Sequence, residues 1–181
     1  GGGFGVNYEN NAIKFNLEGL SKLIKLKFQN PHYTISFEPG RYLVANAGFL
    51  LTKIITIKKN SNTNFIITDA GMHTLLRPAL YNSFHNIIPI NKKGDKTYYT
   101  IAGPICESSD ILAKNILIPK QNVDDYLIIC DVGAYGSVMA SNYNSRGLPA
   151  EILINSNKHK IIRDKENIQT MIEKDKVPEW I

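Results

Sequence analysis

From residue 49 onward the chain is a succession of β-branched segments separated by turn-forming residues, and this pattern restricts the fold more than any other feature. The segments are Phe49 to Lys59, Asn64 to Thr68, Thr97 to Ile101, Tyr126 to Cys130 and Glu151 to Ile162. The residues between them, which are of types common in turns, include Asn60-Ser61-Asn62, Lys93-Gly94-Asp95 and Asn155-Ser156-Asn157. Many strands joined in this way predict a mainly β domain of the Greek-key barrel or sandwich type.

The first forty residues have a different pattern. Residues Leu17 to Phe28 carry spaced apolar side chains among lysines, which predicts a short amphipathic helix. His32 to Phe37 is then typical of a strand and is followed by a Pro-Gly turn. We therefore expect residues 1–40 to be the last α/β unit of a larger α/β domain, and residues 41–181 to be the β domain. A closing helix is expected over Asp164 to Lys174, with Asp164 as N-cap and Asn167 as the alternative.

Composition excludes several classes. The 181 residues are 43% hydrophobic, enough to fill a core, so wholesale disorder is excluded. No stretch approaches the roughly 20 apolar residues of a membrane helix, so no membrane partner is expected. Two cysteines, without a C-x-x-C or H-x-x-x-H pair, are too few for a disulfide framework and predict no metal site. They favour a reducing compartment, and we expect the cytoplasm.

The basic residues have an uneven composition. Only four of the 21 cations are arginines, and Arg is needed where a planar fork must grip a carboxylate or phosphate. Arg41 follows Glu38-Pro39-Gly40, and Arg77 is flanked in sequence by His73 and His85. These two positions are therefore candidate anion-binding residues, although four arginines in a lysine-rich chain can also be ordinary surface residues.

Two glycine-containing stretches near the start are also candidates. Gly1-Gly2-Gly3 could cradle a phosphate with backbone N–H groups, or it could be an added linker. Glu38 stands beside a turn, where a carboxylate could pair with a protonated cofactor nitrogen or form an ordinary surface ion pair.

Two later loops concentrate reactive side chains. The loop Gly103 to Asp110 holds Cys106 and Glu107, which could donate a proton and bind an ammonium group; the alternative is a buried thiol beside a helix N-cap. The loop Asp131 to Gly136 places Tyr135 between glycines, where the phenol could touch a ligand or simply pack in a tight turn.

Taken in order, these segments resemble the carboxy-terminal part of the diaminopimelate decarboxylase family. The stretches that carry the resemblance are GGGFG, EPGRYLVANAG, DAGMHTLLRPALYNSFH, GPICESSD, GAYGSVMASNYNSR and PAEILI. The family are lyases that use pyridoxal 5′-phosphate and have an alanine-racemase-like fold, a TIM-type barrel followed by a β domain. The resemblance thus implies conversion of meso-diaminopimelate to L-lysine and CO2, the last step of lysine biosynthesis.

The resemblance also implies roles for individual residues. Cofactor binding is implied for Gly1, Gly2, Gly3, Glu38, Pro39, Gly40, Arg41 and Tyr135. Substrate binding is implied for Arg41, Arg77, Tyr81, Glu107 and Tyr135. Cys106 matches the proton donor, and in the family the Cys106-Glu107 loop reaches the active site of the neighbouring subunit, which implies a homodimer with shared active sites.

The chain departs from the family in one important respect. None of its 17 lysines stands in the motif of the family's Schiff-base lysine, which lies in the barrel upstream of the glycine run. We therefore expect this polypeptide to be inactive in isolation.

Three other functions are open on the sequence. The chain could belong to an ornithine or arginine decarboxylase of the same fold, although Cys-Glu-Ser-Ser-Asp is diaminopimelate-like. It could instead be a non-catalytic β-domain module. The net charge of +5 invites a nucleic-acid binder, but the lysines are scattered without interleaved aromatic residues, so no nucleic-acid partner is expected.

Overall fold

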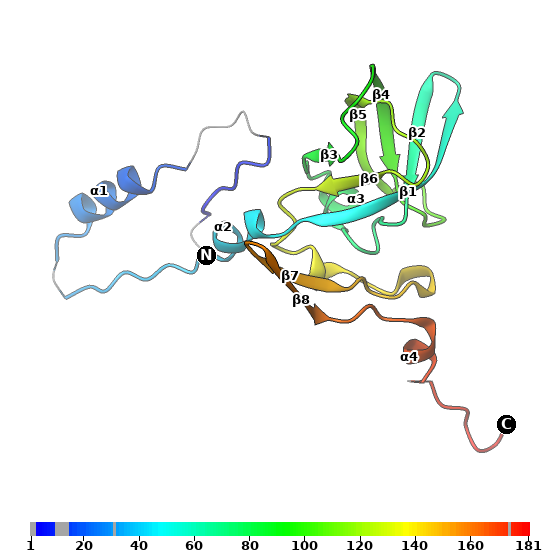
Figure 1. Cartoon of the computed structure of the whole chain (residues 1–181). Helices are drawn as coiled ribbons and strands as arrows, with labels where there is room; N and C mark the ends of the chain where they lie inside the picture. Colours follow the sequence, from blue (N-terminus) through cyan, green and yellow to red (C-terminus); the bar gives the residue numbers. More distant parts are fainter. Residues whose placement is uncertain (1–2, 10–14, 31, 174) are drawn as a thin grey trace.

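A six-stranded, nearly closed sheet dominates the computed structural model, which describes residues 3–9, 15–30, 32–173 and 175–181 (Figure 1). Its strands are β1 (Leu50–Asn60), β2 (Thr63–Thr68), β3 (Ile87–Pro89), β4 (Lys96–Ala102), β5 (Ile111–Pro119) and β6 (Tyr126–Ile129). Their order is β3-β6-β1-β2-β4-β5, and only the β2–β4 pair is parallel. The edge strands β3 and β5 contact each other. The prediction of a mainly β, barrel-like domain is confirmed.

The interior of this barrel is filled by aliphatic side chains from most of its strands. The residues with 0 or 1% exposure in the core cluster are Ile54, Ile66, Leu75, Ile101, Leu127 and Ile129. They come from the segments that the β-branched pattern identified, apart from Leu75 in the connection after β2. Burial of each such side chain contributes about 1.5 to 3 kcal/mol, so this cluster is the main source of stability.

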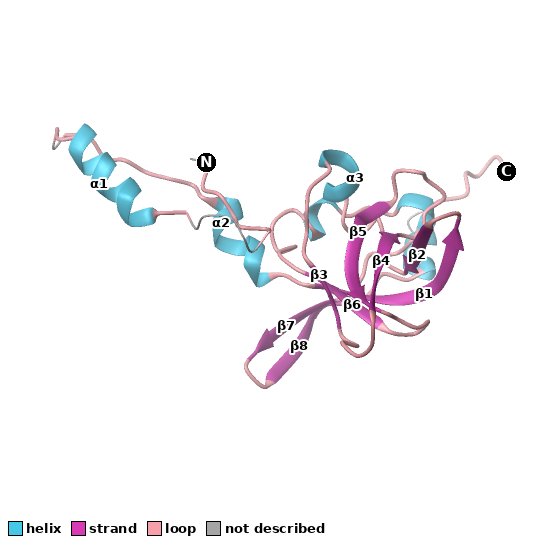
Figure 2. Cartoon of the chain, turned by 90° about the horizontal axis from the view of Figure 1, so that it is seen from above, coloured by secondary structure: helices cyan, strands magenta, loops and turns pink. Residues whose placement is uncertain are grey.

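The first helix lies apart from the sheet. Helix α1 (Leu17–Lys27) begins where expected, because the side chain of Asn16 accepts a hydrogen bond from Gly19 N at 2.8 Å. None of its residues is buried, and Figures 1 and 2 show it standing away from the barrel. The predicted strand His32 to Phe37 is wrong, since residues 33–39 join no sheet among the described part of the chain. A strand needs a partner for its backbone N–H and C=O groups, and no described residue pairs with this segment in a sheet.

Short helices and one hairpin complete the chain. They are α2 (Gly40–Val44), η1 (Ala45–Ala47), α3 (Arg77–Tyr81), η2 (Ser137–Met139), η3 (Tyr143–Ser145), β7 (Glu151–Asn155), β8 (Lys158–Arg163) and α4 (Ile168–Ile172). The closing helix is shorter than predicted, and its N-cap is Asn167 rather than Asp164. Asn167 is favoured because it forms a reciprocal capping box with Thr170. No helix among the described residues is long and apolar enough to cross a bilayer.

Two glycines allow the segment after α2 to cross the loop after β6 at very short range. Gly133 N donates to the carbonyl of Ala45 at 3.0 Å, and Val132 N donates to that of Gly48 at 3.0 Å. A Cβ atom on Gly133 would lie 2.0 Å from the Val44 carbonyl oxygen, and one on Gly48 would lie 2.4 Å from the Gly133 Cα. Only glycine fits at this crossing, which fastens α2 to the loop that carries Tyr135.

Replacing Gly133 by Ala should therefore destabilise the protein. The added methyl group must push the two backbone segments apart, at an expected loss of about 2 to 3 kcal/mol in the free energy of unfolding. Urea unfolding measures this loss. The matched control is Gly5→Ala, because a Cβ there meets no atom within 4 Å; equal stability of the two variants would contradict the crossing.

Candidate active site

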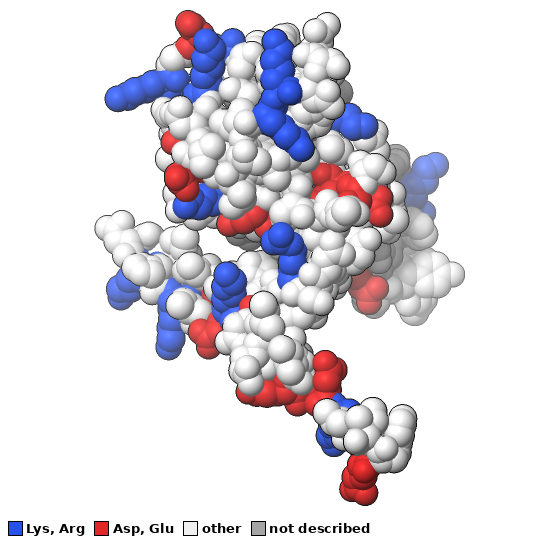
Figure 3. All heavy atoms as spheres, turned by 90° about the vertical axis from the view of Figure 1, so that its right-hand side faces the viewer, with Lys and Arg blue, Asp and Glu red and all other residues white. Residues whose placement is uncertain are grey.

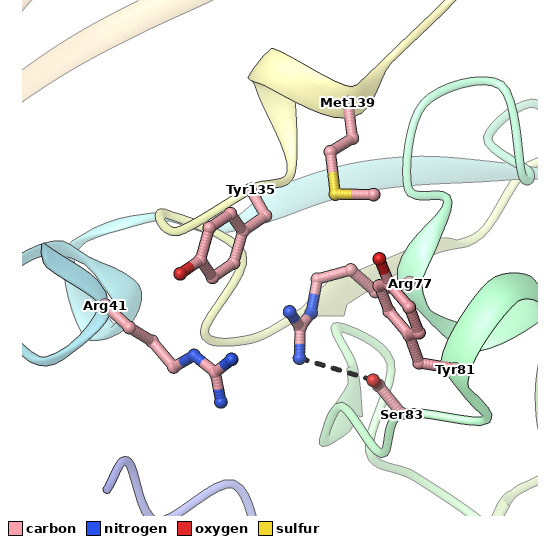
Figure 4. Close-up of a pocket in the computed structure, with 6 residues that line it drawn as sticks. All are labelled: Arg41, Arg77, Tyr81, Ser83, Tyr135 and Met139. Atoms are coloured by element: carbon pink, nitrogen blue, oxygen red, sulfur yellow. Dashed lines mark hydrogen bonds between the residues drawn. The ribbon is translucent and has the colours of Figure 1, made fainter. Parts of the chain in front are cut away.

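Six side chains from different parts of the chain line a cavity of about 430 Å³ (Figure 4). They are Arg41, Arg77, Tyr81, Ser83, Tyr135 and Met139. Arg41 comes from α2, Arg77 and Tyr81 from α3, Tyr135 from the loop after β6, and Met139 from η2. The fold thus brings together four residues that the resemblance singled out, although α2 and the Tyr135 loop are far apart in sequence.

The guanidinium of Arg77 is the most unusual group in this cavity. Arg77 is only 7% exposed, and its Cζ lies 5.2 Å from the ring centroid of Tyr135 and 6.0 Å from that of Tyr81. Its Nη2 donates to the Ser83 hydroxyl at 3.3 Å, whereas the buried Nε has no hydrogen-bond partner. No carboxylate of the described residues forms an ion pair with it.

Such an environment suits an anionic ligand. A buried cation is costly without an anion, and the faces of aromatic rings compensate for only part of that cost. The guanidinium fork matches the two oxygens of a carboxylate. A carboxylate-bearing molecule would therefore match the chemistry of this cavity.

Arg41 brings a second cation to the same ring of Tyr135. Its Cζ lies 5.4 Å from the Tyr135 ring centroid, and Figure 4 shows both guanidinium groups directed into the cavity. Tyr135 has a left-handed backbone, with φ of 69°, which is strained for a non-glycine residue. Gly136 permits this turn, because a Cβ there would lie 2.4 Å from the Val132 carbonyl oxygen. Arg41 lies in the first turn of α2.

The loop with Cys106 and Glu107 is held by a buried carboxylate. Asp110, 2% exposed, accepts hydrogen bonds from Met72 N at 2.6 Å and Ile105 N at 2.8 Å. The interpretation of a helix N-cap in this loop is wrong, since Asp110 leads directly into β5. The Cys106 and Glu107 side chains are exposed and do not line the cavity. The hydrogen bonds of Asp110 thus hold the loop in place while the Cys106 and Glu107 side chains stay exposed to solvent.

The predicted cofactor residues are only partly gathered at the cavity. Gly1 and Gly2 lie outside the described residues, and Glu38, Pro39 and Gly40 do not line the cavity. Gly3 has φ of 65°, and no atom lies within 4 Å of its Cβ position. Its left-handed backbone in open space fits a role in contacting a ligand through main-chain N–H groups. The described residues contain no cluster of three His, Cys, Asp or Glu side chains suited to a metal ion.

Three residues at or near the cavity, Met139, Ser83 and His85, have no role predicted from the sequence. Met139 and Ser83 line the cavity; both stand in stretches that carry the family resemblance, but the resemblance implies no role for either. His85, noted only because it lies near Arg77 in sequence, is 2% exposed, and its Nδ1 lies 3.0 Å from the Cys130 carbonyl oxygen. Because a carbonyl only accepts, Nδ1 carries the proton. Burial lowers the pKa of His85, nearby Arg77 lowers it further, and the bond to Cys130 opposes both.

Comparison with known proteins identifies the class. The family of pyridoxal-dependent decarboxylases, C-terminal sheet domain, matches residues 32–133, and the chain belongs to this family. It is similar to the diaminopimelate decarboxylase of Zymomonas mobilis, with 38% identity over 100% of the chain and 43% of that relative. Similarity to the Archaeoglobus fulgidus diaminopimelate decarboxylase is also 38%, over 100% of the chain and 45% of that relative.

Solved structures agree with this assignment. Diaminopimelate decarboxylase from Methanocaldococcus jannaschii matches with a TM-score of 0.89 and 38% identity, over 97% of this chain and 42% of that one. The Helicobacter pylori enzyme complexed with L-lysine matches with a TM-score of 0.88 and 38% identity, over 94% of this chain and 42% of that one. The chain thus spans less than half the length of the relatives it matches.

The buried state of His85 predicts a dependence of stability on pH. Its folded pKa lies below the ordinary 6.5, so below that pH the unfolded chain binds more protons and stability falls with falling pH. In His85→Gln this decline should be shallower between about pH 7.5 and 5.5, as measured by urea unfolding. Exposed His159→Gln is the control; an unchanged slope in His85→Gln would contradict the buried neutral imidazole.

Proposed function

We propose that this chain is the carboxy-terminal part of a pyridoxal-phosphate-dependent diaminopimelate decarboxylase, which converts meso-diaminopimelate to L-lysine and CO2. The observation that carries the proposal is the buried guanidinium of Arg77, which has no carboxylate partner among the described residues. The substrate has an amino-acid group at each end. One end loses its carboxylate, and the other end retains it for recognition.

Arg77 and its neighbours supply that recognition. The Arg77 fork would bind the carboxylate at the end that does not react, beside the Tyr81 ring, and Glu107 from a second subunit would bind the ammonium group there. A buried donor left without its partner costs about 1 to 3 kcal/mol, more for a charge. A ligand that lacks the distal carboxylate therefore binds poorly to this cavity, which gives the enzyme its selectivity.

The residues around the cavity also fit the cofactor. The left-handed backbone of Gly3 in open space would present N–H groups to its phosphate, Glu38 would face its ring nitrogen with Pro39 and Gly40 forming the adjoining turn, and Arg41 and Tyr135 would contact it from the cavity. When bound, pyridoxal 5′-phosphate supplies an electron sink for the bond that breaks. The chain's own residues orient the substrate and keep the reacting end beside it.

Cys106 and Glu107 would act in the site of a second subunit. Both side chains are exposed and do not line the cavity of their own chain, yet their loop is braced by Asp110. In a homodimer the thiol of Cys106 would donate the proton that replaces CO2. The exposure of this loop supports a shared active site. We further propose that the enzyme is cytoplasmic.

The remaining parts of the enzyme would lie outside this chain. We propose that residues 1–40 belong to the preceding barrel and that residues 41–181 are the β domain. None of the six described residues that line the cavity is a lysine, so the lysine that holds the cofactor would come from the barrel. The isolated chain should therefore show no decarboxylation.

The alternative functions have weaker support. Ornithine and arginine carry no carboxylate at the distal end, so they would leave Arg77 unpaired. A nucleic-acid surface requires a continuous basic patch, whereas the face in Figure 3 carries acidic and basic side chains interspersed. The cavity argues equally against a purely structural module.

The proposed function is tested by CO2 release from the full-length protein that contains this chain. It should decarboxylate meso-diaminopimelate and leave L-ornithine nearly untouched. Arg77→Lys should raise KM for meso-diaminopimelate about 10- to 100-fold, because the charge remains but the fork is lost. Arg146→Lys, outside the cavity, should behave as wild type. Equal activity on both substrates would contradict the proposal.

Shared active sites are tested by subunit mixing. Arg77→Ala and Cys106→Ala proteins should each be nearly inactive, because each lacks one component of every site. Mixing them under conditions that exchange subunits should restore part of the activity, since a mixed dimer contains one site with both components intact. No recovery on mixing, despite subunit exchange verified by native mass spectrometry, would place Cys106 and Arg77 in the same subunit's site.

A further inference from the structure

Tyr8 contacts Arg77 from the N-terminal segment. Its ring centroid lies 5.8 Å from the Arg77 Cζ, so Arg77 has three aromatic rings around one guanidinium, together with Tyr81 and Tyr135. The Tyr8 hydroxyl is buried without a hydrogen-bond partner among the described residues. Tyr8 therefore acts on Arg77 through its ring rather than through a hydrogen bond.

His85 packs against the ring of Tyr8. The two ring centroids lie 5.3 Å apart with an interplanar angle of 74°, an edge-to-face arrangement. His85 itself is fixed by the bond from its Nδ1–H to the Cys130 carbonyl at the end of β6. A continuous series of contacts thus runs from the barrel wall through the imidazole and the phenol ring to the guanidinium.

Arg77 needs such support because little else in the described structure holds its fork. Its one side-chain hydrogen bond is a 3.3 Å contact to a neutral hydroxyl. An arginine side chain has many rotamers, and ordering it only when ligand binds would weaken binding. Rings stacked on a guanidinium hold its plane while leaving its N–H edge free for a carboxylate.

We propose that Tyr8 and His85 are positioning residues for Arg77, and that they set the preference of the site for ligands with a distal carboxylate. This inference rests on the proposed function. L-lysine and cadaverine provide the test, because cadaverine is L-lysine without its carboxylate. Damage to the fold would weaken the binding of both ligands, whereas a less ordered Arg77 side chain would weaken the binding of L-lysine alone.

The experiment measures Kd for L-lysine and for cadaverine by calorimetry on the full-length holoenzyme. In Tyr8→Leu, which removes the ring, L-lysine should bind about 3- to 30-fold more weakly while cadaverine stays within about twofold of wild type. Tyr8→Phe keeps the ring and should retain the wild-type preference. His85→Gln keeps a donor for Cys130 but removes the brace, and should lose part of the preference. Tyr98→Leu, at an exposed tyrosine of β4, is the matched control.

The outcomes separate this inference from the proposed function. The positioning role is overturned if Tyr8→Leu loses affinity equally for both ligands or loses none. The proposed function stands in that case, provided that the wild-type enzyme still prefers L-lysine. If Tyr8→Leu does not fold, His85→Gln decides in the same way: a selective loss of L-lysine supports the inference, and any other result overturns it. A wild-type enzyme that binds both ligands alike would overturn the proposed function itself.

Discussion

The close crossing of two backbone segments at Gly48 and Gly133 is the constraint on which the rest of the site depends. Because neither position has room for a Cβ atom, the segment after α2 can lie directly on the loop after β6. Arg41 lies next to one segment and Tyr135 belongs to the other, and the Arg41 Cζ lies 5.4 Å from the Tyr135 ring centroid. A wider crossing would separate the two groups and open the cavity wall. The packed barrel core holds the strands in place, and Gly48 and Gly133 let the two backbone segments approach closely.

A second principle is the placement of charge. The described structure buries one guanidinium without a carboxylate and surrounds it with aromatic faces, whereas the buried carboxylate of Asp110 is satisfied by backbone N–H groups. The satisfied charge is structural and braces a loop. The unsatisfied charge is the one that we propose binds a ligand. Asp110 and Arg77 thus differ in whether the described structure itself supplies the partners of the buried charge.

Much of this could be predicted from sequence, for identifiable reasons. The barrel strands follow from their β-branched residues, and Arg41, Arg77, Tyr81 and Tyr135 follow from ordered motifs. The strand expected at His32 to Phe37 failed because local pattern cannot show that a pairing partner is missing. The contact of Tyr8 with Arg77 could not be predicted, since it depends on where residues 3–9 lie relative to α3. The sequence thus predicts the chemistry of individual motifs, but it does not predict how segments far apart in the chain pack together.

We propose that Arg77 has no carboxylate partner among the described residues because its guanidinium binds the carboxylate of the ligand. The most direct measurement is a crystal structure of the full-length protein with L-lysine bound. We predict that the carboxylate of L-lysine lies on the guanidinium fork of Arg77, with N–O distances of about 2.7 to 2.9 Å. A structure in which Arg77 pairs with a carboxylate of the protein, while the carboxylate of L-lysine binds elsewhere, would contradict it.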